Sequence, residues 1–93
     1  MSGEALNRTV QITNRRGLHA RASAKFVTMA SGLTANVLVA KDCGPSVVGT
    51  SIMGLMMLGA AMGDSITISA SGAEAAAALD RLCALVEDKF GEE

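Results

Sequence analysis

The chain has 93 residues and a mass of 9.5 kDa, which predicts one domain spanning residues 1–93 and excludes a second. Hydrophobic residues make up 49% of the sequence and charged residues 18%, so the composition is too apolar for an intrinsically disordered chain. A formal net charge of -1 and an aromatic content of 2% argue against nucleic-acid binding, which depends on basic surfaces and stacking side chains.

Neither targeting nor disulfide patterns are evident. The N-terminus has no basic flank and no apolar core of a secretory signal, and the apolar stretch 52–63 is shorter than the roughly 20 residues that a membrane span needs. We therefore expect a cytoplasmic protein without membrane insertion. Cys43 and Cys83 are too far apart for a small disulfide scaffold, so both should be free, Cys43 in a turn and Cys83 on a helical core stripe.

The first half of the chain predicts a strand followed by a helix. Apolar residues alternate with polar ones over about 6–13, which indicates a half-buried strand. A turn at 14–17 follows, in which Gly17 can take a positive φ. Residues 20–31 then show helical spacing up to Gly32, a natural terminator.

Two strands and a short helix should come next. Residues 35–40 and 46–49 are rich in strand formers and are separated by turn residues. Thr50 and Ser51 are capping residues before a helix over 52–58, which Gly59 can end.

The last third predicts a strand and a long helix. From Asp64 onward, apolar and polar residues alternate up to Ser71. Ser71 and Glu74 have capping-box spacing, which predicts the start of the final helix. Its apolar stripe consists of Leu79, Leu82, Cys83, Val86 and Phe90.

The order strand, helix, strand, strand, helix, strand, helix predicts an α+β fold (βαββαβα). Segments of this length and polarity suit a four-stranded, mostly antiparallel sheet with three helices covering one face.

His19 is the only histidine, so a multi-histidine metal site is excluded. We place it at the cap of the first helix, where the backbone N–H groups of Ala20 and Arg21 and the helix dipole favour an anion. The Arg21 side chain can reach the same anion, and Arg15 and Arg16 add positive charge from the turn.

This setting should keep the His19 ring neutral and nucleophilic, because nearby positive charge disfavours imidazolium. A neutral ring nitrogen can attack phosphorus, and an attached phosphoryl group would then favour ring protonation and onward transfer. A histidine at a helix start is more often only a capping or surface residue, and this alternative stays open.

Two motifs carry a resemblance to a known family. They are Gly17-Leu18-His19-Ala20-Arg21, followed by Lys25-Phe26-Val27, and Gly49-Thr50-Ser51-Ile52-Met53-Gly54-Leu55-Met56-Met57-Leu58-Gly59. Together they resemble the HPr phosphocarrier proteins of the phosphoenolpyruvate-dependent phosphotransferase system. The likeness spans nearly the whole chain and implies an open-faced β-sandwich.

The resemblance also implies roles for individual residues. The histidine matching His19 accepts a phosphoryl group on Nδ1 from enzyme I and passes it to an enzyme IIA, and the arginine matching Arg21 steadies the phosphate. The serine matching Ser51 is a regulatory phosphorylation site where an HPr kinase/phosphorylase is present. Such a protein is a stoichiometric carrier without a cofactor or metal, not an enzyme.

One position departs from the sugar-transport members, many of which have proline after the arginine. This chain has Ala22, followed by Ser23 and Ala24, as in members of the nitrogen-related branch. Alanine restores a backbone donor without breaking the helix, so activity should survive. The substitution favours a regulatory role over sugar transport.

The short helix should present a docking patch made of Ile52, Met53 and Met56, because flexible methionines suit a surface with several partners. Packing alone is the usual explanation for such residues, and Ser51 has a simpler role as an N-cap. We expect a monomer.

Two other function classes remain as alternatives. A regulatory interaction protein of the same fold would act without phosphoryl relay. A hydrolase would need an oriented nucleophile and a third residue beside His19, for which no spacing is evident.

Overall fold

The computed structural model describes residues 5–42 and 44–92, and its elements follow the order predicted from the sequence. In chain order they are β1 (Leu6–Gln11), α1 (Ala20–Ser31), β2 (Asn36–Lys41), β3 (Ser46–Val48), α2 (Ile52–Met57), β4 (Ser65–Ser71), α3 (Ala75–Glu87) and the 3-10 turn η1 (Lys89–Gly91). No helix within these ranges is long and apolar enough to cross a membrane.

The four strands form one sheet in the order β1-β4-β2-β3, and all three neighbouring pairs are antiparallel. β4 lies between β1 and β2, with Ile66 opposite Val10 and Ile68 opposite Val39. Ile66 and Ile68 are fully buried, as their alternation with polar residues predicts.

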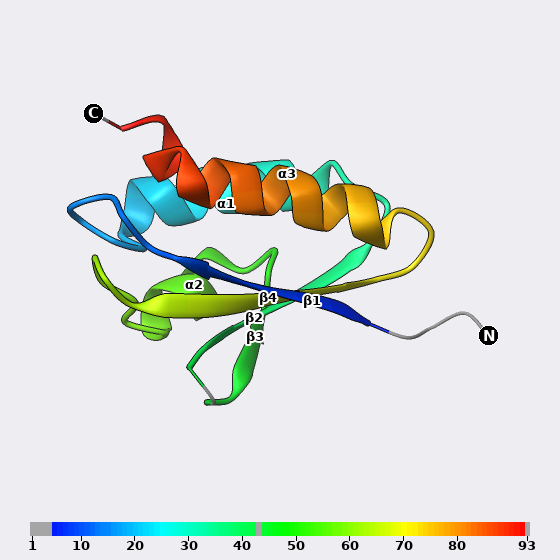
Figure 1. Ribbon diagram of the computed structural model, residues 1–93, viewed down its shortest axis with the longest axis horizontal. Helices are drawn as coiled ribbons and strands as arrows, with labels where there is room; N and C mark the ends of the chain where they lie inside the picture. The colour runs from blue at the N-terminus through cyan, green and yellow to red at the C-terminus, as the bar shows by residue number, and fades with distance from the viewer. Residues whose placement is uncertain (1–4, 43, 93) are drawn as a thin grey trace.

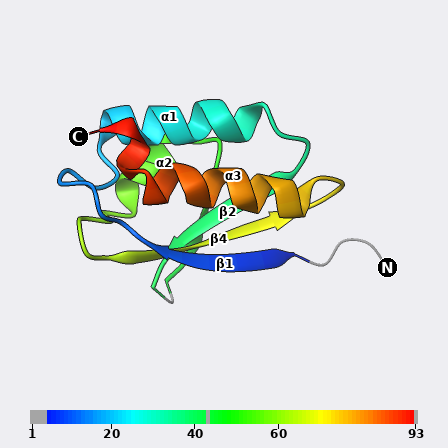
Figure 2. The same cartoon turned by 45° about the horizontal axis from the view of Figure 1, so that its top comes forward.

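α1 and α3 lie side by side over one face of the sheet, and α2 packs against α1 (Figures 1 and 2). Phe26 of α1 and Leu82 of α3 are fully buried in the core beneath them. The other face carries polar pairs between β1 and β4, such as Thr9 Oγ1 and Thr67 Oγ1 at 3.0 Å. The predicted α+β open-faced β-sandwich is confirmed.

The predicted capping box at the start of α3 is wrong. Ser71 is the last residue of β4 and pairs with Asn36, and the N-cap Glu74 makes no side-chain capping bond. After Gly72 turns the chain with a φ of +110°, the Glu74 N–H donates to the Thr34 carbonyl at 3.2 Å. Sheet pairing holds Ser71 in the strand, and backbone carbonyls replace the side-chain cap.

The C-terminal end differs from a continued helix. Phe90 is fully buried as predicted, but it lies in η1 and not on the stripe of α3. Lys89, Phe90 and Gly91 all have left-handed backbones, with φ between 56° and 72°. This turn reverses the chain toward the start of α1. Cys83 is buried on α3 as predicted, whereas Cys43 falls outside the described residues.

Candidate functional site

The loop before α1 is fastened to the segment that follows α2. The Leu18 N–H donates to the Ala60 carbonyl at 3.0 Å. Gly17 has a φ of +64°, and a Cβ at this position would lie 2.4 Å from the Ala60 oxygen. Only glycine fits this close approach, so the position of the next two residues depends on it.

His19 is the N-cap of α1, which confirms the position predicted from the sequence. Its backbone is extended, and its Nδ1 accepts a hydrogen bond of 3.3 Å from the N–H of Arg21. Ala20 and Arg21 are therefore the first two helical residues, and their N–H groups point out of the helix start. The Nδ1 lone pair faces the positive end of the helix dipole.

A carboxylate occupies the other side of the ring. Glu92 Oε2 lies 2.6 Å from His19 Nε2. This hydrogen bond lowers the pKa of Glu92, so the carboxylate is ionised and only accepts hydrogen bonds. Nε2 is therefore the donor and Nδ1 the acceptor, which together define a neutral ring with its proton on Nε2.

Fully and partly buried hydrogen bonds hold Glu92 in place. Asn14 is fully buried, and its Nδ2 donates to the Gly17 carbonyl at 2.9 Å and to Glu92 Oε1 at 3.1 Å. The Lys25 ammonium of α1 donates to the Phe90 carbonyl at 2.7 Å and thus ties η1 to α1. The C-terminal segment, the turn and α1 meet at the imidazole.

Three arginines lie around the Glu92 carboxylate. They are Arg15, Arg16 and Arg21, which together with Glu92 line a hollow of about 230 Å³. Guanidinium groups bind phosphate oxygens in a forked geometry, and a helix N-terminus favours the same charge. The three guanidinium groups make the hollow basic, and its fourth wall is the Glu92 carboxylate that binds His19 Nε2.

The short helix α2 presents apolar side chains to solvent. Ile52, Met53 and Met56 are 40%, 68% and 41% exposed, and Leu55 on the same helix is fully buried. Two further methionines are exposed, Met57 at the end of α2 and Met62 in the segment that follows it. We call these five residues the methionine patch.

Ser51 lies at the start of this helix as its N-cap. Its Oγ accepts a hydrogen bond of 3.0 Å from the Gly54 N–H. The predicted capping role is confirmed.

Comparison with known proteins places this geometry in a family. A family profile described as "PTS HPr component phosphorylation site" matches residues 6–88. The phosphocarrier protein HPr of Cupriavidus necator is 41% identical over 87 residues, covering 94% of this chain and 97% of its own. The chain belongs to the HPr family.

Relatives named for the nitrogen-related form match equally well. The phosphocarrier protein NPr of Shewanella violacea is 42% identical over 87 residues and covers 94% of both chains. Among solved structures, HPr of Thermoanaerobacter tengcongensis superposes with a TM-score of 0.88 at 40% identity, covering 95% of this chain and 98% of its own. This chain is thus similar to phosphocarriers of the phosphotransferase system, both HPr and NPr.

Three residues of this HPr-type site are not identified by any local pattern in the sequence. The sequence predicts Asn14 only as a turn residue and Lys25 only as part of a motif, and it predicts no role for Glu92. Glu92 is 73 positions away from His19, and no local pattern connects them. A polar side chain in a turn beside the only histidine was the one available signal, and it pointed to Asn14.

Proposed function

We propose that this protein is a phosphoryl carrier in which His19 Nδ1 accepts a phosphoryl group and passes it on. The observation that carries the proposal is the pair of hydrogen bonds on the ring, to Arg21 N–H at Nδ1 and to Glu92 at Nε2. These bonds place the proton on Nε2 and the lone pair on Nδ1 at a helix N-terminus, and this lone pair becomes the nucleophile once the Arg21 N–H releases it.

The transfer needs no separate proton acceptor. A bond forms between Nδ1 and phosphorus as the bond between phosphorus and the donor's leaving atom breaks. The ring gains positive charge while its Nε2 proton stays hydrogen-bonded to Glu92. In the onward step the neutral imidazole leaves and the phosphoryl group passes to the acceptor.

Arg21 and the N–H groups of Ala20 and Arg21 would hold the phosphoryl oxygens. The arginine offers forked donors and the helix start offers backbone donors, so both favour the charge of the attached group. The Arg21 N–H now donates to His19 Nδ1, so it would have to break this hydrogen bond and donate to a phosphoryl oxygen instead.

Family membership supports enzyme I as donor, charged from phosphoenolpyruvate, and an enzyme IIA as acceptor. We propose that the chain acts as one cytoplasmic domain and as a monomer, with Arg21, Ile52, Met53 and Met56 in the docking face. The α2 segment is linked to the histidine loop through the Ala60 carbonyl, so a partner on the methionine patch reaches both. Enzyme I and the enzyme IIA would catalyse the transfers, and this chain would act as a stoichiometric carrier and not as an enzyme.

Ser51 is a candidate for regulatory phosphorylation by an HPr kinase/phosphorylase. Phosphate at a helix N-cap suits the dipole, so the fold should tolerate it. The added charge would lie beside the apolar methionine patch, where it would weaken docking.

Ala22 bears on whether this chain belongs to the sugar-transport or the nitrogen-related branch of the family. It is fully buried in the first turn of α1. The resemblance of Ala22-Ser23-Ala24 to nitrogen-related members supports a regulatory output for the relay.

The test is phosphoryl transfer from phosphoenolpyruvate through purified sugar-branch or nitrogen-branch enzyme I to three proteins: wild type, His19→Ala and Ser51→Ala. Intact mass and acid lability identify the adduct. We expect an acid-labile adduct on wild type and Ser51→Ala that is absent from His19→Ala, and a faster rate with nitrogen-branch enzyme I. No adduct from either donor would refute the carrier.

The second candidate is a regulatory interaction protein that works by docking alone. The observation that favours it is the exposed methionine patch, which can bind partners without any transfer. A His19→Ala variant that retains full function in cells would support it over the relay.

A further inference from the structure

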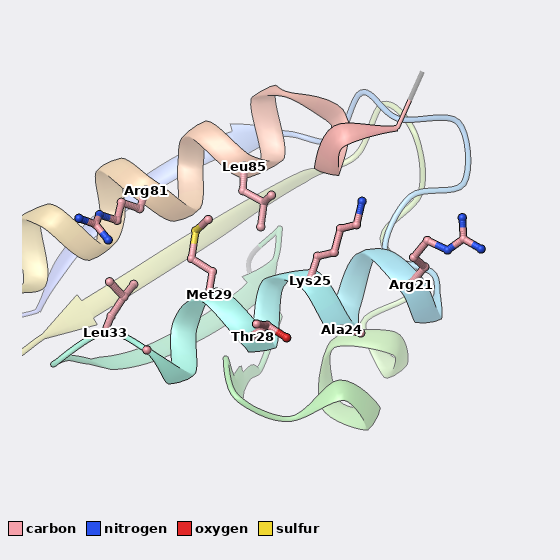
Figure 3. A pocket seen from close by; sticks show the side chains of 9 residues that line it. Arg21, Ala24, Lys25, Thr28, Met29, Leu33, Arg81 and Leu85 are labelled. Carbon is pink, nitrogen blue, oxygen red and sulfur yellow. The ribbon is translucent and has the colours of Figure 1, made fainter.

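A groove runs between α1 and α3 on the helical side of the molecule, and the methionine patch does not contribute to it (Figure 3). Its volume is about 620 Å³, within the range of binding clefts. Met29 and Leu33 lie on its α1 side and Leu85 on its α3 side, and all three are partly buried against the core. This apolar middle is not used by the proposed relay.

The charged side chains of the groove all have the same sign. Arg21 and Lys25 lie at one end and Arg81 at the other, and no acidic residue is among the described residues that line it (Figure 3). The chain as a whole has a formal net charge of -1, so this positive charge is local. Lys25 donates one hydrogen bond to the Phe90 carbonyl, and an ammonium group has three donors in all.

The length of the groove bounds its occupant. Its α1 side extends from Arg21 to Gly32, which is roughly 16 Å at 1.5 Å per residue. An amphipathic helix of about three turns matches this length. The basic ends of the groove require carboxylates at the two ends of this helix. The apolar middle of the groove requires an apolar stripe between them.

We propose that the groove binds an acidic amphipathic helix of a protein partner. The apolar stripe packs on Met29, Leu33 and Leu85, and the terminal carboxylates pair with Lys25 and Arg81. Arg21 lines both the groove and the hollow that it shares with Glu92, so a segment bound here reaches the side chain proposed to hold the phosphoryl group. The proposal goes beyond the relay, because binding in the groove requires no phosphoryl transfer.

The probe is a synthetic amphipathic peptide of about three helical turns with a leucine stripe and glutamates at both ends. Its twin carries lysines in place of the glutamates. Each is titrated into the full-length ¹⁵N-labelled protein, and amide shifts are followed by NMR. We expect the glutamate peptide to shift the amides of Met29, Leu33, Arg81 and Leu85 and to bind at least about tenfold more tightly than its twin.

Three variants locate the contact. Arg81→Glu should weaken binding of the glutamate peptide several-fold and reduce the salt dependence of binding, because it removes a positive charge from the groove. Arg81 is exposed, so its replacement leaves the core intact. Met53→Ser, on the methionine patch, should bind like wild type. His19→Ala should also bind like wild type, which separates this result from any failure of the relay.

Several results would overturn the proposal. They are equal binding of both peptides, an Arg81→Glu variant with unchanged affinity, shifts confined to the methionine patch, or no shifts with either peptide. If the amides of the groove shifted in the same way when the protein concentration was raised without peptide, the occupant of the groove would be a second copy of the chain.

Discussion

The carboxylate of Glu92 accepts a hydrogen bond of 2.6 Å from Nε2 of His19, the ring atom opposite the candidate phosphoryl acceptor. Asn14 holds the second oxygen of the same carboxylate at 3.1 Å. Residues from the turn, the helix cap and the C-terminal segment therefore act on one imidazole. The contact determines which nitrogen carries the proton.

Replacing Glu92 with glutamine tests this role. The amide keeps the shape but loses the negative charge, so the ring should populate both tautomers and the positive charge gained on phosphorylation should lose its partner. Carboxylates that orient functional histidines in metal sites are typically worth about 10- to 100-fold, and we expect at least about a tenfold slower phosphoryl transfer. Imidazole ¹⁵N shifts report the tautomer. Glu87→Gln, on the exposed side of α3, is the matched control and should change neither quantity.

Gly17 and Gly59 form a matched pair for the position of the histidine loop. Both have a φ near +65°, but a Cβ on Gly17 would meet the Ala60 oxygen at 2.4 Å, whereas one on Gly59 would meet nothing within 4 Å. Gly59→Ala should cost about 1 kcal/mol in the free energy of unfolding, and Gly17→Ala about 2 kcal/mol or more. Urea unfolding measures both. Gly17→Ala should also slow the phosphorylation of His19, and equal costs for the two variants would contradict the steric argument.

Asp64 should make stability depend on pH in the acid range. The Ala61 N–H donates to its Oδ2 at 2.9 Å and lowers the pKa of the carboxyl, with a smaller contribution from Lys41 at 3.6 Å. A carboxyl with a lowered pKa stabilises the fold fully above its ordinary value of 3.8 and loses this contribution as the pH falls through the lowered native value.

Asp64→Asn should therefore be less stable than wild type at neutral pH, and the difference should vanish at strongly acidic pH in urea unfolding. The control is Asp42→Asn, because Asp42 is exposed and its φ of 55° suits asparagine equally well. A stability difference for Asp64→Asn that stays constant with pH would refute the assignment.

Met53 and Leu55 are two residues apart on α2, but one is 68% exposed and the other fully buried. Leu55→Ala should cost about 2–5 kcal/mol of unfolding free energy, because it leaves a cavity in the core. Met53→Ala should change stability by about 0.5 kcal/mol or less and instead raise the KM of enzyme I for this protein at unchanged kcat. Calorimetry and steady-state transfer assays separate the two effects. An unchanged KM would remove Met53 from the docking face.

Ser51→Asp tests the proposed regulation. Aspartate can keep the N-cap bond to the Gly54 N–H, so the melting curve should change little, whereas Ser51→Ala should lose about 1 kcal/mol. The added charge beside the methionine patch should slow phosphorylation of His19 by enzyme I, which Ser51→Ala should leave near the wild-type rate. An Asp variant with both a normal rate and a normal melting curve would refute the regulatory argument.

Local pattern was sufficient for most of this protein. The alternation in β4, the helical spacing in α1 and the capping positions of His19 and Ser51 each depend on neighbours within one or two turns, so the order and approximate bounds of the elements follow from the sequence. The exposed side of α2 follows for the same reason. Ser71 is the exception, because its backbone bonds in the sheet outweighed a capping motif of equal local plausibility.

Tertiary structure alone decided the chemistry around the imidazole. Glu92 reaches His19 only because three successive left-handed residues in η1 reverse the chain and Lys25 anchors that turn to α1. The groove between α1 and α3 likewise depends on how the two helices pack. Sequence periodicity reports which side of an element is buried, but contacts between elements depend on chain reversals and packing, and no spacing along the chain encodes them.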